Sequence, residues 1–176
     1  VTGIEHKLNK NIPICLEIYK KDFDSFISQE SVNEAGIPVN ISRAVLMGFN
    51  LKEKCKIFNG FTQMLEYHFV NSSNSLDDTK YVTYQPVHVL KIGCDYIISD
   101  WEFNGNLEYV GERYFKQDNL NKLNPYLLFS VKISKNFSEW LNMFIKGENL
   151  LNQEYEFIKD YTLPKASVRL GANIKF

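Results

Sequence analysis

Three histidines are the side chains best suited to bind a metal or to move a proton, and they lie far apart in the sequence. They are His6, His68 and His88. No H-E-x-x-H motif or other metal-ligand spacing surrounds any of them. We therefore interpret each as a hydrogen-bonded or interfacial histidine, and the sequence predicts no metal site from them.

Two groups of oxygen-bearing side chains could also do chemistry. Asp22 and Asp24 place two carboxylates on one face of a predicted strand, but the neighbouring Lys20 and Lys21 indicate a solvated rim. The cluster from Asn74 to Asp78 offers the oxygen ligands that Ca²⁺ prefers. We interpret it as a solvated polar loop.

Nothing in the chain predicts catalysis. There is no G-x-S-x-G nucleophile motif and no glycine-rich phosphate loop. The three cysteines, Cys15, Cys55 and Cys94, form no C-x-x-C pair. The net charge of −1 gives no electrostatic basis for binding nucleic acid. We expect a protein that is not an enzyme and that has no cofactor.

The elements that would carry these residues are strands, and the last segment has the clearest pattern. From Val168 to Phe176 every even position is apolar and every odd position is polar or glycine. A strand has a period of two, so one face of this segment is apolar and the other is polar.

The same alternation runs through most of the chain. With Val1–Leu8 and the last segment it predicts nine strands, the others being Pro13–Ile27, Asn40–Leu51, Lys56–Val70, Tyr84–Ile98, Trp101–Phe115, Pro125–Ser134 and Ser138–Leu150. No segment has sustained helical periodicity, and no apolar run approaches the roughly 20 residues of a membrane helix. The predicted class is all-β.

The connections between these strands alternate between short and long. The short ones are Asn9–Asn11, Lys52–Lys54, Ser99–Asp100 and Lys135–Asn136, and the long ones are Gln29–Val39, Asn71–Thr83, Gln117–Asn124 and Asn152–Pro164. This alternation is typical of up-and-down hairpins, and transmembrane β-barrels have short turns at one end and long loops at the other. A soluble barrel or sandwich would show the same strand pattern.

Two further features favour the membrane barrel. The charges of several strands fall on one face, as in a barrel with a polar lumen. Aromatic residues gather near strand ends, as the girdles at a membrane interface do; they include Tyr67, Phe69, Trp101, Phe103, Tyr114, Phe115 and Trp140.

Four stretches resemble the TonB-dependent outer-membrane receptors, in the order that this family has them. The clearest is Gly147–Tyr155, followed by Leu163-Pro164 and the final strand; it is similar to the family's N-L-f-[DN]-x-x-Y strand end, proline-containing loop and terminal aromatic strand. Upstream, Ile18–Ile27, Tyr84–His88 and Leu107–Tyr114 resemble the family's F-Y-x-[RK]-[DN]-[IF]-x-[DN]-x-I, P-x-H and Y-x-G-x-[RE]-Y segments.

The resemblance implies an antiparallel transmembrane β-barrel of about 22 strands. About nine up-and-down strands, residues 1–176, would form its C-terminal portion, and the N-terminal plug and first strands would lie outside this chain. The short turns would face the periplasm and the long loops the outside. The implied location is the outer membrane of a Gram-negative-type bacterium. The implied partners are outer-membrane lipid, the remaining strands and plug, the TonB complex acting through the absent N-terminal part, and the outer-membrane assembly machinery.

The function implied by the resemblance is active transport of a scarce solute, such as a metal–siderophore, haem, cobalamin or an oligosaccharide. The expected ligand-binding residues are loop aromatics, namely Tyr81, Tyr114, Phe115, Tyr155 and Tyr161. The final strand would serve as the assembly signal through Val168, Leu170, Ala172, Ile174 and Phe176. Two alternatives stay open, a structural or adhesive barrel piece completed by another chain and a small soluble ligand-binding barrel.

Overall fold

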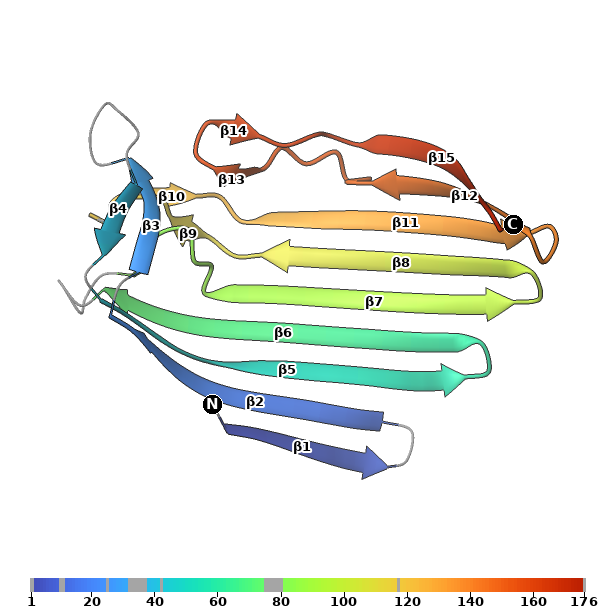
Figure 1. Cartoon of the computed structure of the whole chain (residues 1–176), viewed down its shortest axis with the longest axis horizontal. Coiled ribbons are helices and arrows are strands. Elements are labelled where there is room, and N and C mark those ends of the chain that lie inside the picture. The colour runs from blue at the N-terminus through green and yellow to red at the C-terminus, as the bar shows by residue number, and fades with distance from the viewer. Residues whose placement is uncertain are drawn as a thin grey trace.

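The computed structural model describes residues 2–9, 12–24, 26–31, 38–41, 43–74, 81–116 and 118–175. These residues form strands and their connections (Figure 1). None of them lies in a helix with the length and apolarity needed to cross a bilayer. Nine strands make one antiparallel sheet in the order β1-β2-β5-β6-β7-β8-β11-β12-β15, as the alternation predicted.

The strands of the large sheet are β1 Thr2–Asn9, β2 Ile12–Phe23, β5 Ala44–Phe58, β6 Phe61–Asn74, β7 His88–Ile98, β8 Trp101–Val110, β11 Tyr126–Asn136, β12 Leu141–Glu148 and β15 Ser167–Ile174. Three small hairpins complete the described strands. They are β3 Phe26–Ser31 with β4 Pro38–Ile41, β9 Arg113–Tyr114 with β10 Lys122–Leu123, and β13 Glu156–Ile158 with β14 Tyr161–Thr162.

The cross-strand register gives the sheet two different faces. Leu90 of β7 lies opposite Tyr67 of β6 and Tyr109 of β8, on what we call the apolar face. One residue later, Lys91 lies opposite Glu66 and Glu108 on the polar face. Because directly opposed residues project to the same side, the alternation in each strand adds up to one face of each kind across the sheet.

The turn between β5 and β6 corrects a prediction. The chain reverses at Asn59 and Gly60, where Gly60 has a φ of +82° that a side chain would strain. The predicted turn at Lys52–Lys54 lies inside β5, where successive charged side chains point to opposite faces. Three charged residues in a row therefore continue the strand.

A second boundary also differs from its prediction. The segment predicted as a strand from Ser138 to Leu150 begins pairing only at Leu141. Residues 137–140 form the turn, closed by the Ser138 Oγ, which accepts a hydrogen bond from the Leu141 N–H at 3.2 Å. Trp140 is therefore a turn residue, and the turn predicted at Ser99–Asp100 is confirmed.

The long connections carry the three small hairpins at the end of the sheet opposite the short turns (Figure 1). We call this the loop end and the other the turn end. The buried apolar side chains gather at the loop end, among them Ala44, Val82, Val110, Leu123 and Tyr126. The packed part of the molecule is thus where hairpins meet the sheet.

Two of the family-like motifs have structural explanations. The Gly111 N–H donates to the His88 carbonyl at 2.9 Å, which joins the P-x-H segment to the Y-x-G segment. The Asn149 amide donates to the carbonyls of Gln153 at 2.8 Å and Pro164 at 3.2 Å. Asn149 thereby connects the end of β12 to the proline-containing loop before β15.

Candidate functional site: a pocket on the polar face

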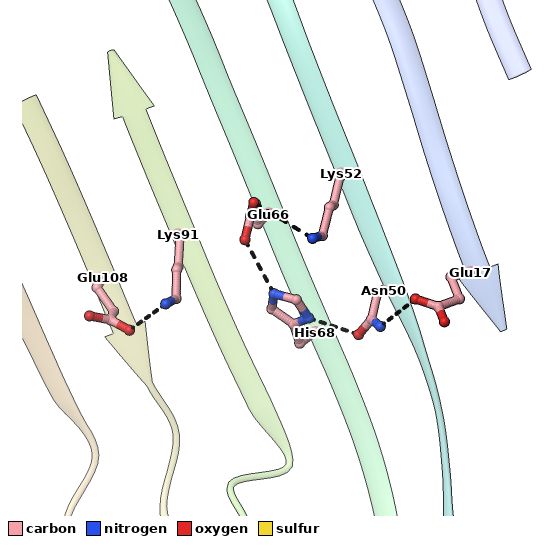
Figure 2. Close-up of polar contacts among 7 residues, drawn as sticks. All are labelled: Glu17, Asn50, Lys52, Glu66, His68, Lys91 and Glu108. Atoms are coloured by element: carbon pink, nitrogen blue, oxygen red, sulfur yellow. Dashed lines mark hydrogen bonds and ion pairs between the residues drawn. The ribbon is translucent and has the colours of Figure 1, made fainter. Parts of the chain in front are cut away.

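A band of polar side chains crosses the polar face of the sheet. Figure 2 shows seven of them, contributed by five neighbouring strands: Glu17, Asn50, Lys52, Glu66, His68, Lys91 and Glu108. Alternation in each strand places its polar residues on this side, and the register brings those of neighbouring strands level with one another.

His68 is held by hydrogen bonds whose directions can be assigned. The Asn50 amide donates through Nδ2 to Glu17 at 3.0 Å, so Asn50 Oδ1 faces His68 Nδ1 at 2.7 Å (Figure 2). Nδ1 must then carry the proton, because Oδ1 can only accept. His68 Nε2 lies 3.5 Å from Glu66 Oε2, so a proton on this nitrogen would face a carboxylate.

Two ion pairs complete the band. Lys91 Nζ lies 3.1 Å from Glu108 Oε1, and Lys52 Nζ lies 3.9 Å from Glu66 Oε1 (Figure 2). Roughly a third to a half of each side chain is exposed, and pairs of this kind contribute only about 0–1 kcal/mol each. Their main effect is to neutralise charge along the face.

The apolar face has large hydrophobic side chains that nothing in the described chain covers. Leu170 is 79 % exposed, Val168 is 63 % exposed and Ile18 is 56 % exposed. Apolar surface of this extent, continuous over a sheet, marks contact with lipid or another protein.

Two groups of aromatic rings lie on the apolar face, one toward each end of the strands. Toward the turn end, Phe61 contacts Tyr96, which contacts Phe103. Toward the loop end, Phe69 packs against Phe49 and His88. Phe61 and Phe69 belong to one strand, and eight residues span about 26 Å along it. At a tilt of roughly 40° this is about 20 Å of height, which fits within the roughly 25 Å apolar band of a membrane barrel. The prediction that aromatic residues gather near strand ends is confirmed for Trp101 and Phe103 at the start of β8. It is wrong for Tyr67 and Phe69, because β6 continues to Asn74 and they lie in its interior.

A pocket of about 640 Å³ opens on the polar face near the loop end. Its floor includes Asn50, His68 and Lys91 from the polar band, and its walls include Tyr84, Tyr126 and Phe157 from the loop end. The volume falls within the about 300–1,000 Å³ typical of small-molecule sites.

Tyr19 forms one wall of this pocket because its strand neighbour is a glycine. Tyr19 of β2 lies opposite Gly48 of β5, and a Cβ on Gly48 would come within 2.9 Å of the Tyr19 hydroxyl and 2.1 Å of the Phe69 carbonyl. The missing side chain lets the ring lie over the neighbouring strand. Tyr19 is consequently 9 % exposed although it lies on the polar face.

Arg113 is the buried charge of the pocket. It is 5 % exposed, and its guanidinium lies 5.2 Å from the centre of the Tyr126 ring. Its Nη2 donates to the Glu156 backbone carbonyl, which links β9 to β13. Burial lowers the pKa of the Arg113 guanidinium from its ordinary value. Nη1 is also buried and has no hydrogen-bond partner among the described residues.

The β13–β14 hairpin closes one side of the pocket with aromatic side chains. Tyr155 lies 4.8 Å from Tyr126 between ring centres, and Phe157 lies 5.7 Å from Tyr155. Burial raises the pKa of the Tyr155 phenol, so this group stays neutral and can donate a hydrogen bond. The cluster joins the hairpin to the sheet through Tyr126.

The five predicted ligand-binding aromatics lie at the loop end but do not form one group. Tyr81 and Tyr114 stack with their ring centres 5.7 Å apart, and Phe115 follows Tyr114 on the same connection. Tyr155 belongs to the cluster beside the pocket, while Tyr161 is 73 % exposed on β14. Tyr114 belongs to the small β9–β10 hairpin and not to the nine-stranded sheet.

The predicted assembly strand is β15, which pairs with β12. Val168, Leu170, Ala172 and Ile174 are exposed on its apolar face, and Phe176 lies outside the described residues. On the other face Arg169 pairs with Glu148, and the Asn173 amide donates to Asn142 at 3.3 Å.

The remaining candidate residues do not gather into a reactive site. No group of three or more His, Cys, Asp or Glu side chains suited to a metal occurs in the part of the chain that the structure describes. Residues 75–78 of the predicted loop cluster Asn74 to Asp78 lie outside that part. Cys15 is on the polar face, whereas Cys55 and Cys94 lie on the apolar face, separated by Gln63. The arrangement is suited to binding.

Several pocket residues were missed by the sequence reasoning. Arg113, Tyr126 and Tyr84 come from three different segments, and only the fold brings them together. Arg113 does belong to the family-like segment Leu107–Tyr114, and this resemblance is the sequence signal that could have identified it. His68 was interpreted as a hydrogen-bonded side chain, and the structure confirms that interpretation.

Comparison with known proteins identifies the family of this chain. The sequence matches the family described as TonB dependent receptor-like, beta-barrel, over residues 14–171. No curated protein matches the chain.

Solved structures with a similar fold include two transporters and one receptor, each much longer than this chain. The copper transporter OprC has a TM-score of 0.81 and 15 % identity, and the match covers 99 % of this chain and 30 % of that one. The ferric citrate transporter FecA, unliganded, has a TM-score of 0.80, 16 % identity and coverages of 99 % and 30 %. The siderophore receptor PirA from Acinetobacter baumannii has a TM-score of 0.77, 13 % identity and coverages of 99 % and 31 %. The chain thus spans less than a third of these structures, and at such identities the likeness concerns the fold.

Proposed function

We infer the function from one premise: this chain belongs to the TonB dependent receptor-like β-barrel family. We propose that it forms part of the barrel wall of an outer-membrane receptor in a Gram-negative-type bacterium. This receptor would import a scarce solute with energy delivered through TonB. Metal–siderophores lead the candidate solutes, followed by haem, cobalamin and oligosaccharides. Similar structures include receptors or transporters for copper, ferric citrate and siderophores.

The observation that carries the proposal is the two-faced sheet. One face exposes large apolar side chains between two groups of aromatic rings, as a wall against lipid requires. The other face has a neutralised polar band and a pocket, as a water-filled or plug-filled lumen requires.

We further propose that residues 1–176 are the C-terminal portion of this barrel. β1 and β15 each have one neighbour in the nine-stranded sheet. An unpaired strand edge is not tolerated in lipid, because its N–H and C=O groups have no water to bind. Other strands, with a plug inside them, would complete the wall, and the N-terminal part would contact TonB.

Deletion of the gene for the full-length receptor tests the transport function. Uptake of labelled ferric siderophores, ferric citrate, copper, haem and cobalamin would be measured in the deletion strain and in a strain lacking TonB. We expect the uptake of one of these solutes to fall in both strains, and its return with the cloned gene. Unchanged uptake of all solutes would contradict the proposal and favour a structural or adhesive barrel piece.

Extraction of the protein tests its location. We expect it in the outer-membrane fraction, released only by detergent. A protein that is soluble and monomeric without detergent or refolding would contradict the membrane assignment and favour a small soluble barrel.

The loop aromatics are our proposed contacts for the solute. Separate alanine substitutions of Tyr81, Tyr114, Phe115, Tyr155 and Tyr161 should lower uptake about tenfold or more at one or more positions, because aromatic side chains dominate many binding sites. Leu120→Ala is the matched control, since this loop side chain is 80 % exposed and is not aromatic. Unchanged uptake in all five variants would remove the proposal.

The last strand is our proposed assembly signal, read by the outer-membrane assembly machinery. Deletion of Phe176 should reduce the amount of folded receptor in the outer membrane, while the receptors that do insert bind solute normally. Quantifying the folded form by its heat-dependent gel migration checks this. Normal insertion of the truncated receptor would contradict it.

A further inference from the structure

Arg113 differs from Lys91, another basic side chain that lines the pocket, because no carboxylate among the described residues lies within ion-pair distance of it. Lys91 Nζ lies 3.1 Å from Glu108 Oε1. Among the described residues Arg113 has no such ion pair, and its one recorded hydrogen bond goes to the neutral backbone carbonyl of Glu156.

The carboxylate of Glu156, the residue whose backbone carbonyl accepts from Arg113, is already engaged elsewhere. The Glu156 side chain lies 3.8 Å from Lys159 Nζ and accepts a hydrogen bond from the Asp160 N–H at 3.4 Å. Arg113 Nη1 is left buried without a partner in the described part of the chain. A buried charge in this state is costly, and a group that accepts a hydrogen bond and carries negative charge relieves that cost.

The pocket beside Arg113 has walls that suit a flat apolar group. Tyr84, Tyr126 and Phe157 contribute rings, and Val89 and Val110 contribute aliphatic surface. A ligand that places a ring against these walls and an oxyanion against Arg113 would use both properties. Arginine holds carboxylates and phosphates well because its planar fork can donate two parallel hydrogen bonds.

We propose that Arg113 anchors an oxyanion subsite in this pocket, which takes the carboxylate or phosphate group of a mid-sized ligand that also carries a flat apolar part. The subsite rests on the proposed function, and it names the chemical class of the solute that the receptor captures first.

Access to the subsite is through the β13–β14 hairpin. Since Nη1 is shielded from water, an oxyanion reaches it only when one wall of the pocket moves. The Nη2 bond to Glu156 holds this hairpin to Arg113, and the hairpin side chains Phe157 and Tyr161 are 53 % and 73 % exposed. The incoming oxyanion replaces a neutral carbonyl as the partner of the guanidinium.

A matched pair of probes tests the subsite on the full-length receptor in lipid nanodiscs. Benzoate and benzamide have the same shape, but only benzoate is an anion. Their dissociation constants would be measured by ligand-observed NMR, with empty nanodiscs as the blank. We expect benzoate to bind about tenfold or more tightly than benzamide, the range of a charge-assisted hydrogen bond, and inorganic phosphate to compete with it. Equal binding of the two probes, or no binding of benzoate, overturns the proposal.

Two variants assign the effect to the residue. Arg113→Met should reduce benzoate binding to the level of benzamide. Lys122→Met is the control. Lys122 is an exposed cation of the β9–β10 hairpin, which also contains Arg113, but Lys122 does not line the pocket. The change should leave benzoate binding within about twofold of the wild type. Benzoate binding unchanged in Arg113→Met overturns the proposal. If this variant does not fold, the two probes on the wild-type receptor still decide.

The outcome is separable from that of the proposed function. A receptor that imports a solute but does not prefer benzoate refutes the subsite alone. A receptor that prefers benzoate through Arg113 but imports none of the solutes refutes the transport function alone.

Discussion

The two faces of the sheet are made from the same strands and yet stabilise the protein in different ways. On the apolar face the contribution comes from area, as at Leu170 and Ile18, and no particular partner is needed. On the polar face it comes from directed contacts, as between Asn50 and both Glu17 and His68. The apolar face should therefore tolerate changes of shape but not of polarity, and the polar face should do the reverse.

Introducing an arginine on one face or the other should give the largest difference in the free energy of unfolding. Ile92 is on the apolar face near the middle of β7, and Asn106 is on the polar face of the adjacent β8. Ile92→Arg should destabilise the membrane-inserted receptor by about 2–4 kcal/mol, the range for arginine at the midplane of a barrel. Asn106→Arg should cost less than about 1 kcal/mol because water or polar groups reach the lumen. Urea titration of the full-length protein in lipid vesicles measures both, and similar costs would refute the assignment of the faces.

Loss of a central polar partner should have a smaller effect. Asn50→Leu removes the group that joins Glu17 to His68, and we expect a cost of about 1–2 kcal/mol from the two polar groups left without it. Asn124→Leu makes the same change at an exposed loop position and should stay within about 0.5 kcal/mol of the wild type. The same urea titration applies. If Asn50→Leu matches its control, the polar band is only solvated surface.

A single ion pair should contribute least to the free energy of unfolding. In a double-mutant cycle of Lys91→Met and Glu108→Gln, the coupling free energy should be about 0.2–1 kcal/mol because both side chains are partly exposed. The coupling should also fall as salt is added. A larger coupling that is insensitive to salt would mean that water does not reach this part of the lumen.

The strands and their faces could be predicted because the period of two is a local property of the chain. In β15, Leu170 and Ile174 lie on the apolar face and Arg169 and Asn173 on the polar face, as the alternation predicted. The family-like segment ending in Asn149 was also informative, since its side chain closes the loop before this strand.

The β5–β6 turn was missed although the sequence carries its signal. Asn59-Gly60 is the dipeptide most typical of a two-residue hairpin turn. The run Lys52-Glu53-Lys54 was preferred because it is charged. Charge alone does not end a strand when one face is polar, as it is here.

The pocket could not be predicted because it depends on register and on hairpins within the long connections. Tyr19 reaches its place because Gly48 lies opposite it, and Arg113 contacts Tyr126 from the small β9–β10 hairpin at the loop end. Pairings between segments this far apart in sequence leave no local pattern.

The lengths of β5 and β6 bear on the conditions under which a solute would be captured. They have 15 and 14 residues, which is about 50 Å of strand and about 38 Å of height at a tilt of roughly 40°. The apolar band of a barrel is only about 25 Å tall. With the turn ends at one edge of this band, about 13 Å of wall would extend beyond the lipid at the loop end. In the proposed orientation the pocket, at the loop end, would face the ionic medium outside the cell. At the salt concentration of sea water the screening length is only about 4 Å. This part of the wall would therefore attract charged solutes less strongly in sea water than in fresh water.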